Sequence, residues 1–163
     1  MKRRTFIVTI LTLASLPHTL TAQEPAELFA GVERAFREKE PGWKVESKLP
    51  SESSDPRGGS ITFRSGEGQA NVDVRVWRQE KDAREVFEAE GRAFANMRGK
   101  RMVKGAVPGL GDESQLWTHP GSEAWPMLRF RKGRVNVQVF APTVTVARRF
   151  ARRVLAQIES AAD

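Results

Sequence analysis

The last third of the chain most constrains the fold, because two short alternating segments run directly into a strongly amphipathic one. Apolar and polar residues alternate through residues 128–131 and 135–139, which is the period of a strand with one buried face. A short turn at residues 132–134 separates them. After Thr143, a suitable helix N-cap, apolar residues recur at the spacing of a one-sided helix as far as Ile158. This segment therefore predicts a strand-strand-helix unit.

A second unit of the same kind occurs earlier in the chain. Residues 61–64 and 71–77 alternate in the same way, and residues 81–97 follow as an amphipathic helix. Asp82 and Glu85 are spaced like a capping box at its start. The two units match in sequence at Phe63-Arg64 with Phe130-Arg131 and at residues 71–74 with residues 136–139. An internal duplication and the shared pattern of hairpins explain this match equally well.

The remaining segments complete one domain. Residues 25–38 have helical periodicity, residues 43–49 and 116–118 have the character of strands, and residues 50–59 and 107–114 are rich in turn formers. Together the segments predict an α+β fold with an antiparallel sheet of about six strands and helices packed on one face. Two related strand-strand-helix halves could form this sheet.

The N-terminus has the three parts of a secretory signal peptide. Lys2, Arg3 and Arg4 form a basic start, a short apolar run follows, and a small residue, Ala22, precedes a polar one. We expect cleavage near Ala22, a mature domain over residues 23–163, and a periplasmic or secreted location. The apolar run is too short for a permanent membrane span, so no stable membrane insertion is expected after cleavage.

The net charge and the cysteine content exclude several classes of function for this chain. Without residues 1–22 the chain has 24 basic and 20 acidic residues, so its formal net charge falls from +7 to +4. This modest charge, together with export, disfavours nucleic acid as a partner. The chain has no cysteine, which excludes disulfides, a thiolate nucleophile, a cysteine-ligated zinc and a lipoprotein anchor.

Several of these motifs together resemble known proteins. A Gly-Leu-Gly-Asp turn at residues 109–112, a strand, a Phe-Arg-Lys-Gly hairpin at residues 130–133 and a final helix containing residues 147–151 are similar to small exported bacterial proteins. More distantly, residues 61–158 resemble the PsbP/Mog1-like α+β class. The resemblance implies the fold and export, and it assigns no catalytic residue.

Residues for catalysis are few. Asp112, Ser114 and His119 are the only local material for a hydrolase triad, and no nucleophile-elbow pattern surrounds the serine. Asp112, Glu113 and His119 match no known metal-site spacing, and Gly109 with Gly111 lacks the rest of a phosphate loop. We therefore predict no metal site, no cofactor and no catalytic role for His119.

The polar side of the predicted sheet is the stronger candidate for binding. Alternation sends seven residues to the face opposite the apolar one: Arg64, Arg75, Trp77, Arg129, Arg131, Gln138 and Phe140. Arginines beside aromatic rings can bind an anionic, partly apolar partner. The alternative is a solvated face on which Asp73 pairs with a neighbouring arginine. On either interpretation, Arg129 and Arg131 are expected to face solvent.

The last helix carries a second group of arginines outside its apolar stripe: Arg148, Arg149, Arg152 and Arg153. The preceding helix carries acids, namely Asp82, Glu85, Glu88 and Glu90. If the two helices lie side by side, these charges would pair across the groove between them. We expect that structural role for the last-helix arginines.

The sequence therefore predicts an exported binding or interaction module rather than an enzyme. Its partner is unknown, and an anionic ligand or an envelope protein would fit the predicted arginine face. A hydrolase using Asp112, Ser114 and His119 is one alternative. An envelope assembly or maintenance factor is another.

Overall fold

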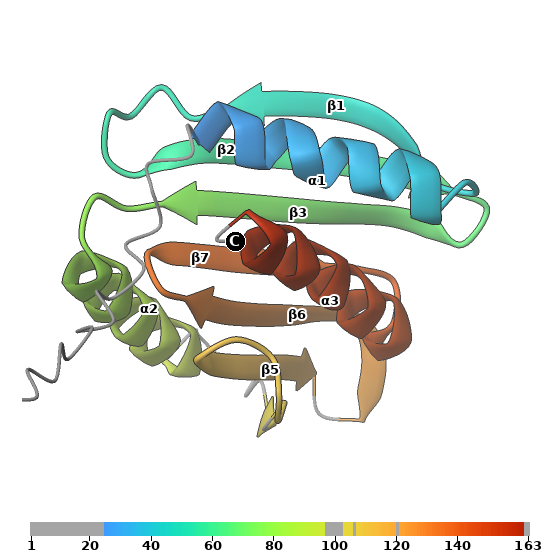
Figure 1. The fold of residues 1–163 in the computed structure, drawn as a ribbon. Coiled ribbons are helices and arrows are strands. Elements are labelled where there is room, and N and C mark those ends of the chain that lie inside the picture. Colours follow the sequence, from blue (N-terminus) through green and yellow to red (C-terminus); the bar gives the residue numbers. More distant parts are fainter. Residues whose placement is uncertain (1–24, 97–102, 106, 120, 162–163) are drawn as a thin grey trace, which may run out of the picture.

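The computed structural model describes residues 25–96, 103–105, 107–119 and 121–161. The predicted signal peptide at residues 1–22 and the predicted helix end at Met97 lie outside the described residues. Within them the chain forms α1 (Pro25–Lys39), β1 (Lys44–Pro50), β2 (Arg57–Ser65), β3 (Gly68–Val76), α2 (Glu80–Ala95), β4 (Val103–Gly105), β5 (Glu113–His119), β6 (Ser122–Lys132), β7 (Val135–Phe140) and α3 (Val144–Ser160), as Figure 1 shows. The predicted helices and strands are confirmed.

All described strands join one antiparallel sheet in the order β1-β2-β3-β7-β6-β5-β4 (Figure 1). This arrangement confirms the α+β class. The sheet has seven strands rather than about six, because the three-residue β4 adds to one edge. The pairing of β3 with β7 joins the two predicted strand-strand-helix units at the centre of the sheet.

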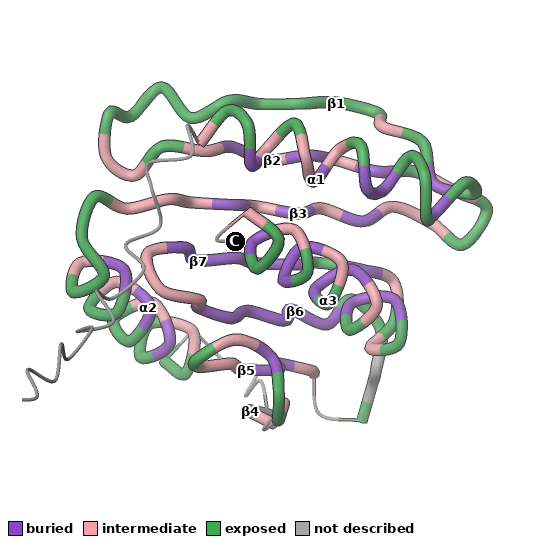
Figure 2. The backbone as a smooth tube through the Cα atoms, viewed as in Figure 1, coloured by how far each residue is buried: buried purple, intermediate pink, exposed green. Residues whose placement is uncertain are grey.

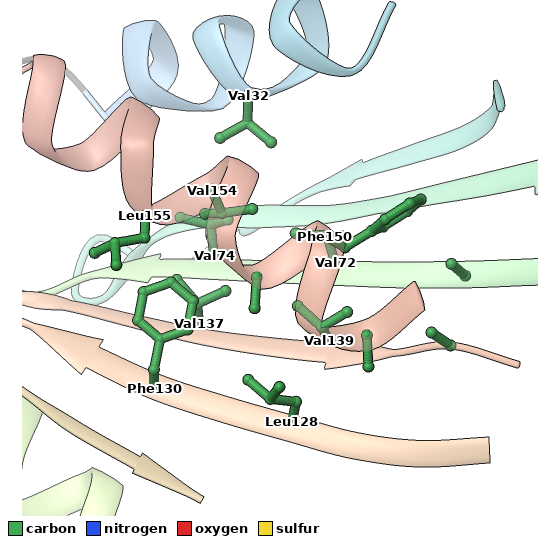
Figure 3. Packing of buried hydrophobic residues seen from close by; sticks show 14 of the residues in the cluster. Val32, Val72, Val74, Leu128, Phe130, Val137, Val139, Phe150, Val154 and Leu155 are labelled. Atoms are coloured by element: carbon green, nitrogen blue, oxygen red, sulfur yellow. The ribbon is translucent and has the colours of Figure 1, made fainter. Parts of the chain in front are cut away.

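Two helices, α1 and α3, cover one face of the sheet and form the main core with it. Val72 lies opposite Val139, and Val74 lies opposite Val137, so neighbouring strands present their apolar residues as continuous rows. Figure 3 shows Val154 of α3 near these rows. All five side chains are buried, and the alternation in the sequence explains why one face is apolar throughout.

Aromatic rings fill the part of this core between α1, α3 and β2. The centroid of Phe36 lies 4.5 Å from that of Phe63 and 4.5 Å from that of Phe150. Trp43, just before β1, packs edge-on against Phe150 at 5.0 Å. Ring pairs at these separations add about 0.5–1.5 kcal/mol each to the burial of their area, so this cluster fixes both helices on the sheet.

The third helix, α2, lies on the opposite face, which corrects the expectation that the helices pack on one face. The carbonyl oxygen of Ala83 accepts a hydrogen bond from Asn136 Nδ2 at 2.8 Å, and that of Phe87 accepts one from Arg129 Nη2 at 3.1 Å. Asn136 and Arg129 alternate with the residues of the main core, so α2 must pack on their side of the sheet.

The periodicity of α2 predicts an apolar stripe but gives no information about which face receives it. The polar residues of β6 and β7 look solvated in sequence, yet polar side chains can be buried when their hydrogen bonds are satisfied. Figure 2 shows that β6 and β7 are buried along most of their length, whereas β1 is exposed.

The two predicted halves share their strand pairs but not the placement of the helix that follows. β3 and β7 are antiparallel neighbours. A twofold rotation that exchanges two such strands has its axis perpendicular to the sheet, so a helix on one face of the sheet would be carried onto a helix on the same face. The helices after them, α2 and α3, lie on opposite faces. The halves are therefore not related by a simple rotation.

The N-terminal caps of α2 and α3 were both predicted, and only the cap of α3 is confirmed. Thr143 is the N-cap of α3, and its side chain accepts a hydrogen bond from Val146 N. α2 instead begins after Gln79, which makes no side-chain capping bond. The predicted capping box of Asp82 and Glu85 is wrong, because the helix starts before Asp82.

Candidate functional site

The structure divides the seven predicted binding residues into two groups. Three are buried beneath α2: Arg129, Arg131 and Gln138. The other four are half-buried or exposed: Arg64, Arg75, Trp77 and Phe140. The predicted face is therefore not one continuous surface.

Glu90 of α2 is the centre of the buried polar network. Its Oε2 accepts from Arg129 Nη2 at 2.8 Å and from Gln138 Nε2 at 2.9 Å. Its Oε1 accepts from Arg75 Nη1 at 2.7 Å. One carboxylate thus joins strands β3, β6 and β7 to α2, and hydrogen bonds to charged groups of this length are among the strong ones.

Arg129 is 1% exposed and has the surroundings of a core residue. Its guanidinium lies 4.4 Å from the ring centroid of Phe87 and 5.4 Å from that of Phe94. Burial lowers the pKa of Arg129, and the charge of Glu90 opposes that shift. The aromatic rings and one carboxylate stabilise this cation within the protein.

Arg131 is 3% exposed and lies among acidic groups. Its Nε donates to Glu113 Oε1 and its Nη1 donates to Glu80 Oε1, both at 3.0 Å. Nη1 also lies 3.3 Å from Asp112 Oδ2. Three carboxylates therefore compensate this single positive charge.

These contacts correct the prediction that Arg129 and Arg131 face solvent. Alternation correctly assigns them to the face opposite Phe130, but α2 covers that face. Because their charges are matched by Glu80, Glu90 and other acids of the same chain, they do not form a free surface for an anion.

Two further members of the predicted set lie apart from this network. Arg64 is exposed, and its Nε bonds Glu46 Oε1 of the neighbouring strand at 2.6 Å. Phe140, at the end of β7, is 36% exposed. An exposed ion pair and a single exposed ring are ordinary surface features.

Arg75 and Trp77 remain together at the margin of α2, where they help to line a hollow of about 330 Å³. We call it the Asp73 hollow; its lining residues are Leu49, Ser51, Pro56, Gly59, Ser60, Asp73, Arg75, Trp77 and Val86. Asp73 Oδ1 accepts from Arg75 Nε at 2.9 Å. Burial raises the pKa of Asp73, although Arg75 acts in the opposite direction.

The arginines of α3 do not pair with the acids of α2, because the two helices lie on opposite faces of the sheet. Glu40, buried just after α1, instead lies 3.2 Å from Arg149 Nε and 3.4 Å from Arg153 Nε. Arg149 Nη2 also lies 3.6 Å from Glu67 Oε1. The expected pairing of the last helix with α2 is therefore wrong, although a structural role holds for Arg149 and Arg153.

The other two arginines of α3 are exposed, and Arg148 and Arg152 have no hydrogen-bond or salt-bridge partner within the described ranges. They lie four residues apart, so they are neighbours on the helix surface. We call Arg148, Arg149, Arg152 and Arg153 the arginine ridge. With Thr145 the ridge lines an open groove of about 560 Å³.

The three residues of the hydrolase alternative do not come together. Ser114 Oγ donates to the carbonyl oxygen of Val107 at 2.6 Å, and Asp112 Oδ2 accepts from Gly133 N at 2.7 Å. Ser114 and His119 are five residues apart on β5, a separation of roughly 15 Å along a strand. The geometry therefore gives the hydrolase alternative no support.

The described residues contain neither a metal-binding cluster nor a membrane-spanning helix. Among them, no group of three or more histidine or acidic side chains is arranged to hold a metal ion. None of the helices in the described ranges has the length and apolar character needed to cross a bilayer.

The fold defines an α+β protein whose antiparallel sheet lies between α1 and α3 on one face and α2 on the other. No protein-family model matches the chain, and no curated protein matches it in sequence. A crystal structure of a GTP binding regulator from Thermotoga maritima is similar in fold, with a TM-score of 0.53 and 12% identity over 88% of this chain and 91% of that chain. Similarity at this identity shows the fold alone, so the resemblance to PsbP/Mog1-like proteins stays a prediction.

Sequence reasoning missed the organising roles of Glu90 and Glu40. A signal for Glu90 was available, because it falls on the apolar stripe of α2 between Phe87 and Phe94. An acid at an inward position indicates a buried partner. Glu40 had no such signal, since it follows α1 and meets α3 only in the folded chain.

Proposed function

We propose that the chain is an exported, non-catalytic binding module that contacts a phosphate-bearing partner through the arginine ridge of α3. The observation that carries this proposal is the exposed pair of Arg148 and Arg152, for which the described residues provide no hydrogen-bond or salt-bridge partner. They stand beside two arginines that Glu40 holds in place. In contrast, Ser114 and His119 of the hydrolase alternative are far apart on β5.

The charge of the ridge supports an anionic partner. Among the described residues, its four arginines are in contact with two acids, Glu40 and Glu67, which leaves two positive charges without an acidic partner there. The buried Glu40 accepts a hydrogen bond from Arg153 Nε at 3.4 Å and lies 3.2 Å from Arg149 Nε. These contacts restrict both side chains, so less side-chain freedom is lost when a partner binds. A ridge that is partly ordered in advance suits recognition of an extended anionic surface.

Phosphate is the anion that this arrangement fits best. Guanidinium groups form paired hydrogen bonds to phosphate oxygens, which compact ammonium groups cannot do. All four cations of the ridge are arginines, and none is a lysine. Lipid headgroups and free polyphosphates both supply this chemistry to an exported protein.

The test measures binding of the purified protein to phosphatidylglycerol-containing vesicles, to phosphatidylcholine vesicles and to tripolyphosphate. Arg148→Ala with Arg152→Ala is expected to weaken the phosphate-dependent binding about 30-fold, because each arginine near an anionic surface contributes about 1 kcal/mol. Binding is also expected to weaken as the salt concentration rises.

The control is Lys81→Ala with Arg92→Ala, which removes the same charge from exposed positions of α2 on the opposite face. Preference for phosphatidylglycerol vesicles would assign the phosphate to a lipid surface, and preference for tripolyphosphate would assign it to a soluble ligand. Absence of binding to both, or an equal loss in the control variant, would refute the proposal.

A further inference from the structure

Helix α2 stands outside the main hydrophobic core. Within the described residues, the core cluster is formed by residues of α1, α3, the strands and the loops between them, and it contains no residue of α2. Helix α3 buries seven residues, whereas α2 buries Ala83, Phe87 and Gly91. Release of α2 from the sheet would therefore leave the main core intact.

Polar contacts hold α2 on the sheet instead. Two of its backbone carbonyls, at Ala83 and Phe87, accept hydrogen bonds from side chains of β7 and β6. The carboxylates of Glu80 and Glu90 accept hydrogen bonds from arginines of the strands. Water can replace each of these partners after release, so the net contribution of such bonds to docking is modest.

The contact between α2 and the sheet also contains buried polar atoms that make no hydrogen bond. These atoms are Nε and Nη1 of Arg129 and Oδ1 of Asn136, and none of them has a partner in the described residues. Both residues bond backbone carbonyls of α2, so they lie at this contact. A buried polar atom without a partner is unfavourable. The docked arrangement therefore carries a penalty that is relieved when water reaches these atoms.

Release of α2 would uncover one cation without an acid. Arg75 and Arg131 each keep a carboxylate from outside α2. Arg129 is 1% exposed, and Glu90 is its only acidic partner in the described part of the chain. The uncovered face would present the guanidinium of Arg129 beside the amide of Gln138, its cross-strand neighbour.

The contacts of α2 define the kind of partner that this face fits. The carboxylate of Glu90 bonds Arg129 Nη2 at 2.8 Å, and the ring centroid of Phe87 lies 4.4 Å from the same guanidinium. The two residues are three positions apart, so they share one face of the helix. Another acidic helix with this spacing can make the same contacts, and its carboxylates can also bond the donors that α2 leaves unused.

We propose that α2 is an autoinhibitory cover, which leaves the sheet as a unit while the rest of the domain stays folded, and that the uncovered Arg129 binds an acidic helix of a partner protein. In the closed form the arginines of this face have acidic partners within the chain. Opening exchanges α2 for the partner helix. This inference is independent of the arginine ridge.

Hydrogen exchange of the full protein tests whether α2 opens alone. Amides in the middle of α2 are expected to exchange about 100-fold faster than those in the middle of α1, a helix of nearly the same length that belongs to the core. Glu90→Gln is expected to accelerate exchange in α2 about tenfold further and to leave α1 unchanged, because it weakens hydrogen bonds to a charged group. Glu88→Gln, in an exposed pair of the same helix, is the control and is expected to change neither. Exchange in α2 at the rate of α1 would refute the opening.

A fluorescently labelled peptide copy of α2, residues 79–96, is the probe for the uncovered face. It is expected to bind the Glu90→Gln protein about tenfold more tightly than the parent, because a larger fraction of that protein is open. Two variant peptides of equal net charge separate specific binding from charge-driven binding. The Glu88→Gln peptide is expected to bind as the unmodified peptide does, and the Glu90→Gln peptide about tenfold more weakly. Equal affinities of the two variant peptides, or absence of binding to the Glu90→Gln protein, would refute the proposed partner.

Discussion

At the scale of single residues, Glu90 connects its own helix, α2, to three strands of the sheet. It accepts hydrogen bonds from Arg75, Arg129 and Gln138, which belong to three different strands. Arg129 is 1% exposed and would be left without its carboxylate if Glu90 were removed. Removal of the Glu90 side chain should therefore destabilise the protein more than removal of an exposed glutamate on the same helix.

Glu90→Ala is expected to destabilise the protein by about 2–3 kcal/mol. This value is below the roughly 3–5 kcal/mol for breaking a fully buried pair, because the Glu90 side chain is 26% exposed. Glu88→Ala is the control, since its exposed pair with Arg92 contributes about half a kcal/mol or less. Urea unfolding of both variants provides the comparison. Equal losses would contradict the role given to Glu90.

Asp73 gives a prediction about pH. Burial raises its pKa in the folded protein above its ordinary value, so folding favours the protonated form. Its unfavourable contribution is therefore absent below the unfolded pKa and is fully present once the pH exceeds the folded pKa. The parent is expected to lose stability relative to Asp73→Asn as the pH rises through this window, as measured by urea unfolding. A relative gain over the same window would show that Arg75 outweighs burial.

At the scale of elements, the sequence predicts the three helices and six of the seven strands of the described residues, because most of them have a clear period, and it misses β4, which has only three residues. The N-cap Thr143 and the apolar stripe ending at Ile158 identified α3 correctly. The face to which α2 binds could not be predicted in the same way. Its buried partners on β6 and β7, Arg129 and Gln138, carry polar ends that look solvent-facing until the acid on α2 is known to lie over them.

The start of α3 provides a local test. Thr143→Ala removes the side-chain acceptor of Val146 N and is expected to cost about 1 kcal/mol. Thr143→Ser keeps a hydroxyl at the cap and should remain within about half a kcal/mol of the parent. Thermal unfolding of the two variants measures the difference. Equal stability of both would mean that the cap bond contributes nothing.

At the scale of the whole molecule, a sheet covered on both faces accounts for the difference between the predicted and the proposed site. α1 and α3 bury the apolar face, and α2 buries the arginines of β6 under its own acids. Within the described residues, Arg148 and Arg152 on the outer side of α3 have no acidic partner. Sequence reasoning identified both groups of arginines. It expected the sheet group to face solvent and the last-helix group to pair with acids of α2, because it placed α2 on the same face of the sheet as α3.

The proposed binding role of the arginine ridge is tested most directly by one comparison of vesicle affinities. Arg148→Ala with Arg152→Ala changes the ridge, and Arg64→Ala with Arg75→Ala removes the same charge from the predicted sheet face. Affinity for phosphatidylglycerol vesicles is expected to fall about 30-fold for the ridge pair and to stay at the parent value for the sheet pair. A loss confined to the sheet pair would contradict the account and return the binding surface to the sheet.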